Sequence, residues 1–280
     1  MVRHGTLLAE VKSGYGLDPA AEIRLLRAIS RAAGPVAFAP TCLGAHALPP
    51  EFENDPDGYI SEVCRRLLPE VERLRLAEFV DVYCDRNAFS VDHSCRYLEA
   101  AASHGFGLTI HASQFANFGA VELAVRLGAL SASHLEAIEP PQVELLSRSG
   151  TIATLLPASV LHLGLNRYAP ARALIDAGAA VALATDFNPG SSPTPSLPMV
   201  MSLACAQMRI SPAEALTAVT VNAAAALRRI DSAGILEAGR PADFNLFAVH
   251  DYREIPYYLG ANLLKYAFRA GRPVYRQGEP

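Results

Sequence analysis

The feature that most constrains the fold of this chain is a regular alternation between short apolar runs and longer amphipathic stretches. Such an alternation is typical of β-strand–α-helix–β-strand units, because consecutive parallel strands need a helical crossover between them. Six of the runs are apolar enough to be buried on both faces, as parallel strands usually are. The sequence therefore predicts an α/β protein with a parallel sheet, whose expected strands are 7–12, 36–43, 79–84, 107–111, 130–134, 152–155 and 181–186.

Start signals for helices stand between these strands. Asp18 precedes a proline, so a capping side chain stands before a residue whose missing N–H costs nothing at the first helical position. Ser211 and Glu214 have the spacing of a capping box, again with a proline at the first position. Apolar residues recur at three- and four-residue steps over 23–29 and 59–74, which predicts a helix in each segment.

The number of strand–helix units bears on the domain organisation. Seven units are one short of the eight that close a TIM-like (β/α) barrel. We therefore expect residues 1–235 to form an incomplete barrel. Either another chain supplies the missing strand, or the sequence is a fragment. After residue 242 the residue pattern changes, and it predicts short strands over 242–249 and 267–275. Residues 236–280 are expected to form a separate β-rich segment.

Composition limits the kind of partner. The chain has 280 residues and a formal net charge of −4, and no basic stretch runs longer than about a pair. Nucleic acid and anionic membrane surfaces are therefore poor candidates, and a small molecule is the better one. The five cysteines include no CxxC pair, which favours reduced thiols. The longest apolar runs fall far short of the ~20 residues of a membrane span. We expect a cytoplasmic protein.

Three residues that can bind a metal ion or move a proton end expected strands. His111, His134 and Asp186 stand where a β/α barrel places its site, at the carboxyl ends of the strands. Imidazole and carboxylate groups that converge from separate strands suit a zinc or iron ion that keeps one position for water. The alternative is that each of the three is only a hydrogen-bonded residue at the end of a strand.

Further polar loops follow the expected strands. Residues 186–193 form a turn punctuated by glycine and proline, which can direct backbone N–H groups and hydroxyls at an anionic ligand. Tyr15 stands between two glycines after the first strand, and His46 follows the second. Each could donate a hydrogen bond to a substrate, although taken singly both are more often structural.

The motifs together resemble those of the imidazolonepropionases, metal-dependent amidohydrolases that act in histidine degradation. They occur in the same order and extend over the whole chain. The segments at 43–47 and 184–194 are specific to these enzymes rather than to amidohydrolases at large. The matching segments are EVKSGYGL at 10–17, LGAHA at 43–47, IHA at 110–112, ATDFNPGSSPT at 184–194 and NAAAAL at 222–227.

The resemblance implies a fold and a reaction. The fold is an amidohydrolase-type barrel that lacks its first β/α unit, with a remnant of a small β-sandwich domain at the C-terminus. The reaction opens the ring of 4-imidazolone-5-propanoate to N-formimidoyl-glutamate, through a water activated by one zinc or iron ion. By position, His111 and Asp186 match metal ligands. Asp186 also matches the residue that moves the water's proton, and His134 matches one that polarises the substrate or positions the water.

The resemblance also implies how the substrate is bound. Family members often dimerise, so a homodimer is a further expectation. Gln114 stands where the family has a glutamate, three positions after His111, and an amide can bind substrate but cannot accept a proton as a carboxylate does. The other residues that match substrate-contacting positions are Tyr15, His46, Asn188, Gly190 and Ser191.

One departure from the family bears on whether the chain is an enzyme. The family carries a His-x-His pair of metal ligands on its first barrel strand, and this sequence has no His-x-His. Met1 aligns where the family's first helix is ending, which leaves two of about four expected ligands. Three hypotheses stay open: an imidazolonepropionase-type hydrolase, a truncated non-catalytic homologue, and a related amidohydrolase or deaminase of another ring.

Overall fold

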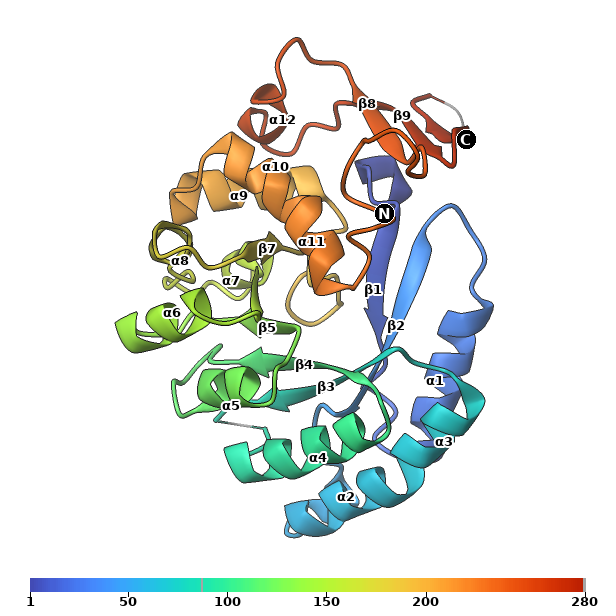
Figure 1. The fold of residues 1–280 in the computed structure, drawn as a ribbon, viewed down its shortest axis with the longest axis vertical. Helices are drawn as coiled ribbons and strands as arrows, with labels where there is room; N and C mark the ends of the chain where they lie inside the picture. Colours follow the sequence, from blue (N-terminus) through green and yellow to red (C-terminus); the bar gives the residue numbers. More distant parts are fainter. Residues whose placement is uncertain (87, 279–280) are drawn as a thin grey trace. The chain divides into compact units, whose positions relative to one another are not determined.

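The computed structural model describes residues 1–86 and 88–278. The chain divides into two compact units. The first, called here the β3 unit, consists of the described residues of 10–33 and 38–153. The second, the β7 unit, consists of those of 1–9, 34–37 and 154–280. Each unit has its own helices, strands and hydrogen-bonded loops (Figure 1).

Parallel strands that follow chain order form the sheet of the β3 unit. The register is continuous from the pair Phe79 and Gly107 to the pair Cys84 and Ala112, which places Tyr83 directly beside His111. The predicted strands 79–84 and 152–155 are confirmed to the residue, and the others of this unit to within two. The strands are β1 (Leu8–Lys12), β2 (Ala37–Ala45), β3 (Phe79–Cys84), β4 (Gly107–Ala112) and β5 (Ser131–His134), followed by β6 (Ile152–Leu155), which runs on into the β7 unit.

The helices of the β3 unit cover the sheet, and α4 packs on both β3 and β4 (Figure 1). The predicted cap is confirmed, since the Asp18 carboxylate accepts hydrogen bonds from the N–H groups of Ala20 and Ala21 at 2.8 and 3.0 Å. The core contains the fully buried side chains of Tyr59 and Tyr97. The helices are α1 (Pro19–Arg31), η2 (Pro50–Phe52), α2 (Pro56–Glu62), η3 (Val63–Leu67), α3 (Leu68–Leu74), α4 (Val91–Ser103), α5 (Ala120–Arg126) and α6 (Pro140–Ser147).

The predicted helix 59–74 is helical throughout but not regular. Its middle, Val63–Leu67, is a π-helical segment between two α-helical ones. Pro69 lies just after this segment and has no N–H to donate to the carbonyl four residues earlier. A local change in hydrogen-bond spacing is a usual answer to such a defect.

The β7 unit holds the strand β7 (Val181–Leu183) and most of the remaining helices. The expected strand 181–186 is wrong at its end, because the chain leaves the strand after Leu183 and turns at Asp186, whose φ is +50°. The predicted capping box of Ser211 and Glu214 is confirmed. The helices are α7 (Pro157–His162), α8 (Ala171–Asp176), α9 (Leu197–Met208), α10 (Pro212–Val219) and α11 (Val221–Ala226).

A small antiparallel sheet belongs to the same unit. Its strands lie in the order β10-β9-β8, and Figure 1 labels β8 and β9. The side chain of Asn245 donates to the carbonyl of Gly5, which ties the sheet to the first residues of the chain. No described helix is long and apolar enough to cross a membrane. The elements are η1 (Val2–His4), β8 (Phe244–Phe247), α12 (Glu254–Tyr257), β9 (Leu264–Arg269) and β10 (Arg272–Arg276).

Candidate functional site

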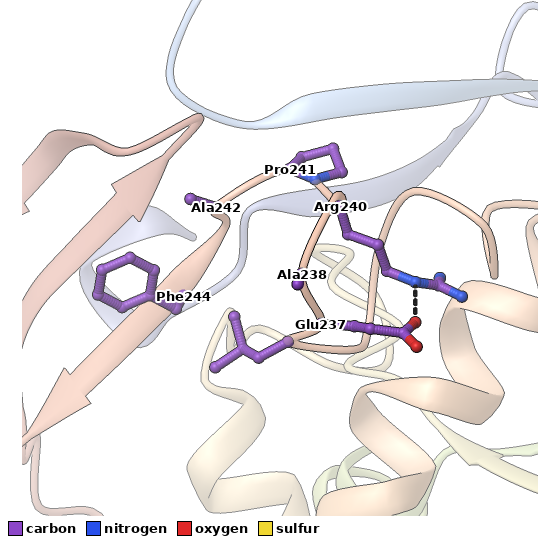
Figure 2. A pocket seen from close by; sticks show the side chains of 7 residues that line it. Glu237, Ala238, Arg240, Pro241, Ala242 and Phe244 are labelled. Atoms are coloured by element: carbon purple, nitrogen blue, oxygen red, sulfur yellow. Dashed lines mark hydrogen bonds and ion pairs between the residues drawn. The ribbon is translucent and has the colours of Figure 1, made fainter.

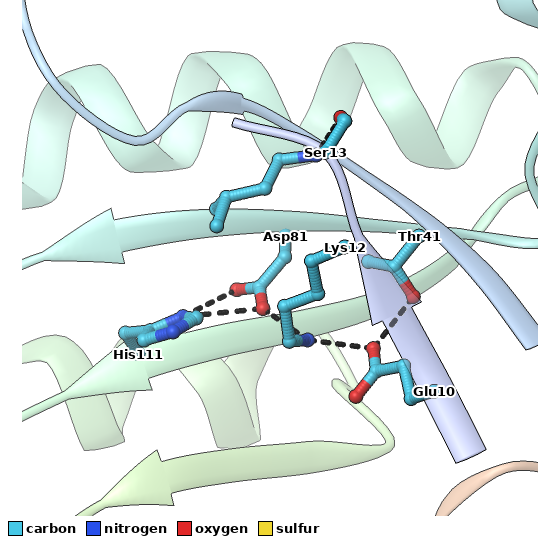
Figure 3. Close-up of polar contacts among 7 residues, drawn as sticks. Glu10, Lys12, Ser13, Thr41, Asp81 and His111 are labelled. Atoms are coloured by element: carbon cyan, nitrogen blue, oxygen red, sulfur yellow. Dashed lines mark hydrogen bonds and ion pairs between the residues drawn. The ribbon is translucent and has the colours of Figure 1, made fainter. Parts of the chain in front are cut away.

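A chain of charged side chains contacts the Nδ1 atom of His111 (Figure 3). The two oxygens of the Asp81 carboxylate lie 3.1 and 3.2 Å from His111 Nδ1. Lys12 Nζ lies 2.6 Å from Asp81 and 2.6 Å from Glu10, and the Thr41 hydroxyl donates to Glu10 at 2.6 Å. Sequence reasoning did not identify Asp81, because a carboxylate inside an apolar strand becomes informative only when its partners on neighbouring strands are known.

The contacts within this chain shift the pKa values of Asp81 and Lys12. Burial opposes ionisation of Asp81, but the positive charges and hydrogen bonds of His111 and Lys12 hold the pKa of this carboxyl well below its usual range. Burial likewise opposes the charge on Lys12, but Asp81 and Glu10 raise the pKa of the amine above its usual range. When His111 is neutral, a carboxylate that accepts its Nδ1 proton leaves the Nε2 lone pair for a metal ion or a hydrogen-bond donor.

Aromatic and imidazole rings continue from His111 in a series within the β3 unit. The ring centroids of Tyr15 and His46 are 4.9 Å apart, and those of His46 and Tyr83 are 6.0 Å apart. Tyr83 is 5.6 Å from His111, which is 5.4 Å from His134. The four predicted residues Tyr15, His46, His111 and His134 therefore lie in one series of neighbouring rings, together with Tyr83, which the sequence did not single out.

Gln114 joins this series through its amide. The Tyr83 hydroxyl donates a hydrogen bond to Gln114 Oε1 at 2.8 Å. With its oxygen engaged, the amide has its N–H groups left to donate, so Gln114 is set up to bind an acceptor atom. The adjacent Ser113 has a φ of +54°, and Phe115 N–H donates to Asp85 at 3.0 Å, which fixes the loop after β4.

The other four predicted site residues lie together in a turn of the β7 unit. Asn188 Oδ1 accepts the N–H groups of Gly190 and Ser191 at 2.8 and 2.7 Å. Asn188 Nδ2 donates to the carbonyl of Asp186 at 2.7 Å, and the Ser191 hydroxyl lies 3.4 Å from the Asp186 carboxylate. The two backbone N–H groups are thus used within the turn, while the hydroxyl and carboxylate are side by side.

The structure groups the predicted site residues into two sets. Asp186, Asn188, Gly190 and Ser191 form the turn of the β7 unit. The set in the β3 unit is Tyr15, His46, His111, Gln114 and His134, with Tyr83 linking its members.

The residues of the described chain do not by themselves complete a metal site. His111 fits a metal ligand, since its second nitrogen is held by a carboxylate, as in most metal-binding histidines. However, no group of three His, Cys, Asp or Glu side chains among the described residues is placed to hold an ion. A catalytic zinc usually needs three protein ligands.

An open hollow in the β7 unit contains none of the predicted site residues (Figure 2). Its polar groups are already paired, since Arg240 Nε lies 2.7 Å from Glu237. It is lined by Leu236, Glu237, Ala238, Arg240, Pro241, Ala242 and Phe244.

Comparison with known proteins adds a family and a set of relatives. The sequence model of the amidohydrolase family matches residues 12–274. The chain is 53% identical to the imidazolonepropionase of Rubrobacter xylanophilus over 274 residues, 97% of this chain and 65% of that protein. It is 46% identical to the imidazolonepropionase of Geobacillus thermodenitrificans over 278 residues, 99% of this chain and 65% of that protein. The chain thus spans about two thirds of the length of these relatives.

Solved structures of low sequence identity share the fold. An adenosine deaminase from Xanthomonas campestris with bound zinc has a TM-score of 0.73 at 18% identity, over 99% of this chain and 67% of that one. The 5-methylcytosine deaminase from Klebsiella pneumoniae has a TM-score of 0.76 at 16% identity, over 99% of this chain and 72% of that one. The predicted amidohydrolase-type β/α architecture is confirmed.

Proposed function

The chain belongs to the amidohydrolase family, and on this premise we propose that it acts as an imidazolonepropionase-type hydrolase. The substrate is 4-imidazolone-5-propanoate and the product is N-formimidoyl-glutamate. Water adds to the ring carbonyl carbon, the ring C–N bond breaks, and the leaving nitrogen takes a proton. The observation that supports this most strongly is the 53% identity over 97% of the chain, combined with the grouping of matched residues in the β3 unit.

In this proposal the residues of the β3 unit bind and orient the substrate. Tyr15 and His46 donate hydrogen bonds to it, and Gln114 donates from an amide whose oxygen is held by Tyr83. His134 polarises the substrate or positions the attacking water. Gln114 replaces the glutamate that the family resemblance leads one to expect, so this position binds an acceptor atom and takes no proton.

The turn of the β7 unit carries the remaining roles. Asp186 takes the proton of the attacking water and returns it to the leaving nitrogen, and its carboxylate lies next to the Ser191 hydroxyl. Asn188, Gly190 and Ser191 are proposed to contact the substrate. The well-defined hydrogen bonds of this turn support a fixed position for the Asp186 carboxylate.

A single zinc or iron ion is part of the proposal, with His111 and Asp186 as candidate ligands. Such an ion would supply a more acidic water at neutral pH. The described residues contain no group of three His, Cys, Asp or Glu side chains that could hold such an ion. For that reason a non-catalytic homologue is kept as a second candidate function. A cytoplasmic homodimer, with residues 1–235 and 236–280 as its two domains, completes the proposal.

The experiment that tests the function is a direct assay of the purified chain with 4-imidazolone-5-propanoate, with and without added Zn²⁺ or Fe²⁺. We expect N-formimidoyl-glutamate to form, and His111→Ala to abolish its formation. His162→Ala, outside the site, is the matched control and should keep the activity of the parent chain. A folded chain that forms no product with either ion would favour the non-catalytic homologue.

The role of Gln114 makes a separate prediction through Tyr83. Tyr83→Phe removes the hydroxyl that holds the amide oxygen, so the Gln114 side chain loses its fixed orientation. One neutral hydrogen bond contributes about 0.5–1.5 kcal/mol, so kcat/KM should fall roughly 3- to 10-fold. Steady-state kinetics measure the change. Tyr257→Phe, at a residue that is 75% exposed, is the control and should leave kcat/KM unchanged.

A further inference from the structure

Glu136 is a buried carboxylate to which the proposed function assigns no role. Its exposed fraction is 3%, as is that of His134, two residues earlier in the loop after β5. Glu136 Oε1 lies 3.7 Å from His134 Nδ1, within ion-pair range and slightly beyond hydrogen-bond length. Glu136 Oε2 accepts no hydrogen bond from any described residue. A buried acceptor without a donor is costly, so its presence calls for a physical explanation.

The other buried carboxylates of the β3 unit are all satisfied. Glu22 accepts the N–H groups of two glycines, Asp81 is paired with Lys12, and Asp85 accepts two backbone N–H groups. Among the described residues, Glu136 is therefore the one buried carboxylate of this unit with an oxygen that accepts no hydrogen bond.

The backbone holds Glu136 and His134 in a strained loop. His134 and Leu135 have φ values of +79° and +70°, in the left-handed region that residues with side chains adopt rarely. The loop is fixed by hydrogen bonds from Leu135 N–H to the Ala112 carbonyl at 3.1 Å and from Ala137 N–H to the Ser113 carbonyl at 2.7 Å. The strain therefore lies where the loop is bound against the end of β4, one residue from Gln114.

The same arrangement of imidazole and carboxylate occurs twice in this cluster. Asp81 lies beside Nδ1 of His111, and Glu136 lies beside Nδ1 of His134, while the centroids of the two tilted rings are 5.4 Å apart. A carboxylate beside Nδ1 favours the tautomer with its proton on that nitrogen. The lone pair then lies on Nε2, where it can accept a hydrogen bond from water.

We propose that Glu136 is a positioning residue for His134, which holds the proton on Nδ1 so that Nε2 accepts a hydrogen bond from the attacking water. This inference rests on the proposed function and decides between the two roles given above for His134. The 3.7 Å contact closes to a hydrogen bond when the water is bound, since catalytic hydrogen bonds are often long before substrate binds.

The test is the tautomer of His134, measured on the ¹⁵N-labelled 280-residue chain by NMR of the imidazole nitrogens. His134→Gln assigns the signal. We expect a proton on Nδ1 in the parent chain and a shift toward Nε2 in Glu136→Leu, with the other histidine signals unchanged as a check on folding. Glu136→Gln keeps an acceptor oxygen and should retain the parent tautomer in part. Glu144→Leu, at an exposed carboxylate on α6, is the control and should change nothing.

Two results would overturn the proposal: a parent chain whose His134 proton is on Nε2, or a Glu136→Leu variant with the parent His134 spectrum. In the turnover assay, Glu136→Leu should lower kcat roughly 10- to 100-fold with little change in KM, as the loss of an outer partner does elsewhere. The NMR result needs no turnover, so it decides the role of Glu136 even if the chain does not act on the proposed substrate.

Discussion

At the scale of single residues, the most consequential finding is that charges in the middle of an apolar sheet support one another. Asp81 lies within a strand that the sequence predicts to be buried, and its side chain is fully buried. The one-dimensional pattern indicates only that a carboxylate there must have a partner. The structure supplies two partners from neighbouring strands, Lys12 and His111.

Removing the buried charge of Asp81 should be costly. Asp81→Asn leaves the part-buried Lys12 with Glu10 alone, and breaking one partner of a buried pair typically costs about 3–5 kcal/mol. We expect the free energy of unfolding to fall by about 3 kcal/mol in urea denaturation. Glu70→Gln, at a solvent-exposed pair with Arg73, is the control and should leave the free energy of unfolding nearly unchanged. The double variant Lys12→Met/Asp81→Asn should cost less than the sum of the two single changes.

At the scale of elements, the start of α10 shows how a local signal combines with a tertiary contact. The sequence predicts the capping box of Ser211 and Glu214 because both residues lie within one turn. It does not predict that Arg172 on α8 also donates two hydrogen bonds to Glu214, at 2.9 and 3.0 Å. The hydrogen bonds of Arg172 and of the Ser211 N–H lower the pKa of Glu214 to about 2.

This contact makes stability depend on pH in a defined direction. The folded-state pKa of about 2 lies below the unfolded value of about 4.3. As pH falls between these values, the unfolded state binds the proton first, so the stabilisation present above pH 4.3 is lost toward pH 2. Glu214→Gln should lower the free energy of unfolding at pH 7 by up to about 1 kcal/mol, allowing for solvent screening.

Urea unfolding curves at pH 7 and pH 2.5 measure this effect. The difference between the parent chain and Glu214→Gln should be largest at pH 7 and roughly a quarter as large at pH 2.5. Glu237→Gln, at an exposed pair with Arg240, is the control. A difference that stays constant with pH would contradict the role assigned to the Glu214 charge.

At the scale of the whole molecule, the metal content of the purified chain is the decisive quantity. Asp81 contacts Nδ1 of His111, an arrangement common in metal-binding histidines. However, the described residues provide no group of three ligands. A catalytic zinc usually needs three protein ligands, so we expect the ion of the proposed function to be held weakly. Less than about one tenth of a zinc or iron ion per chain should remain after dialysis, by elemental analysis, and turnover should depend on added Zn²⁺ or Fe²⁺. About one ion per chain, lost in His111→Ala, would contradict this and would mean that other groups complete the site.

The sequence by itself determined the elements and most of the candidate residues. Strand lengths, the Asp18 cap and the capping box at Ser211 follow from local patterns, because hydrophobic period and terminal hydrogen bonds involve only neighbours in the chain. The motifs also singled out Tyr15 and His46, each in its own loop, and the structure places their ring centroids 4.9 Å apart. The division at residue 235 stays a prediction.

Only the tertiary structure decided which polar groups share a site. The pairing of Tyr83 with Gln114, of Asp81 with His111 and of Glu136 with His134 depends on strand register and on backbone turns with positive φ. The sequence predicted that the last strand of the sheet extends to Asp186, whereas the strand ends at Leu183. Hydrogen bonds of buried groups are satisfied in three dimensions, so their partners cannot be inferred from the spacing of residues along the chain.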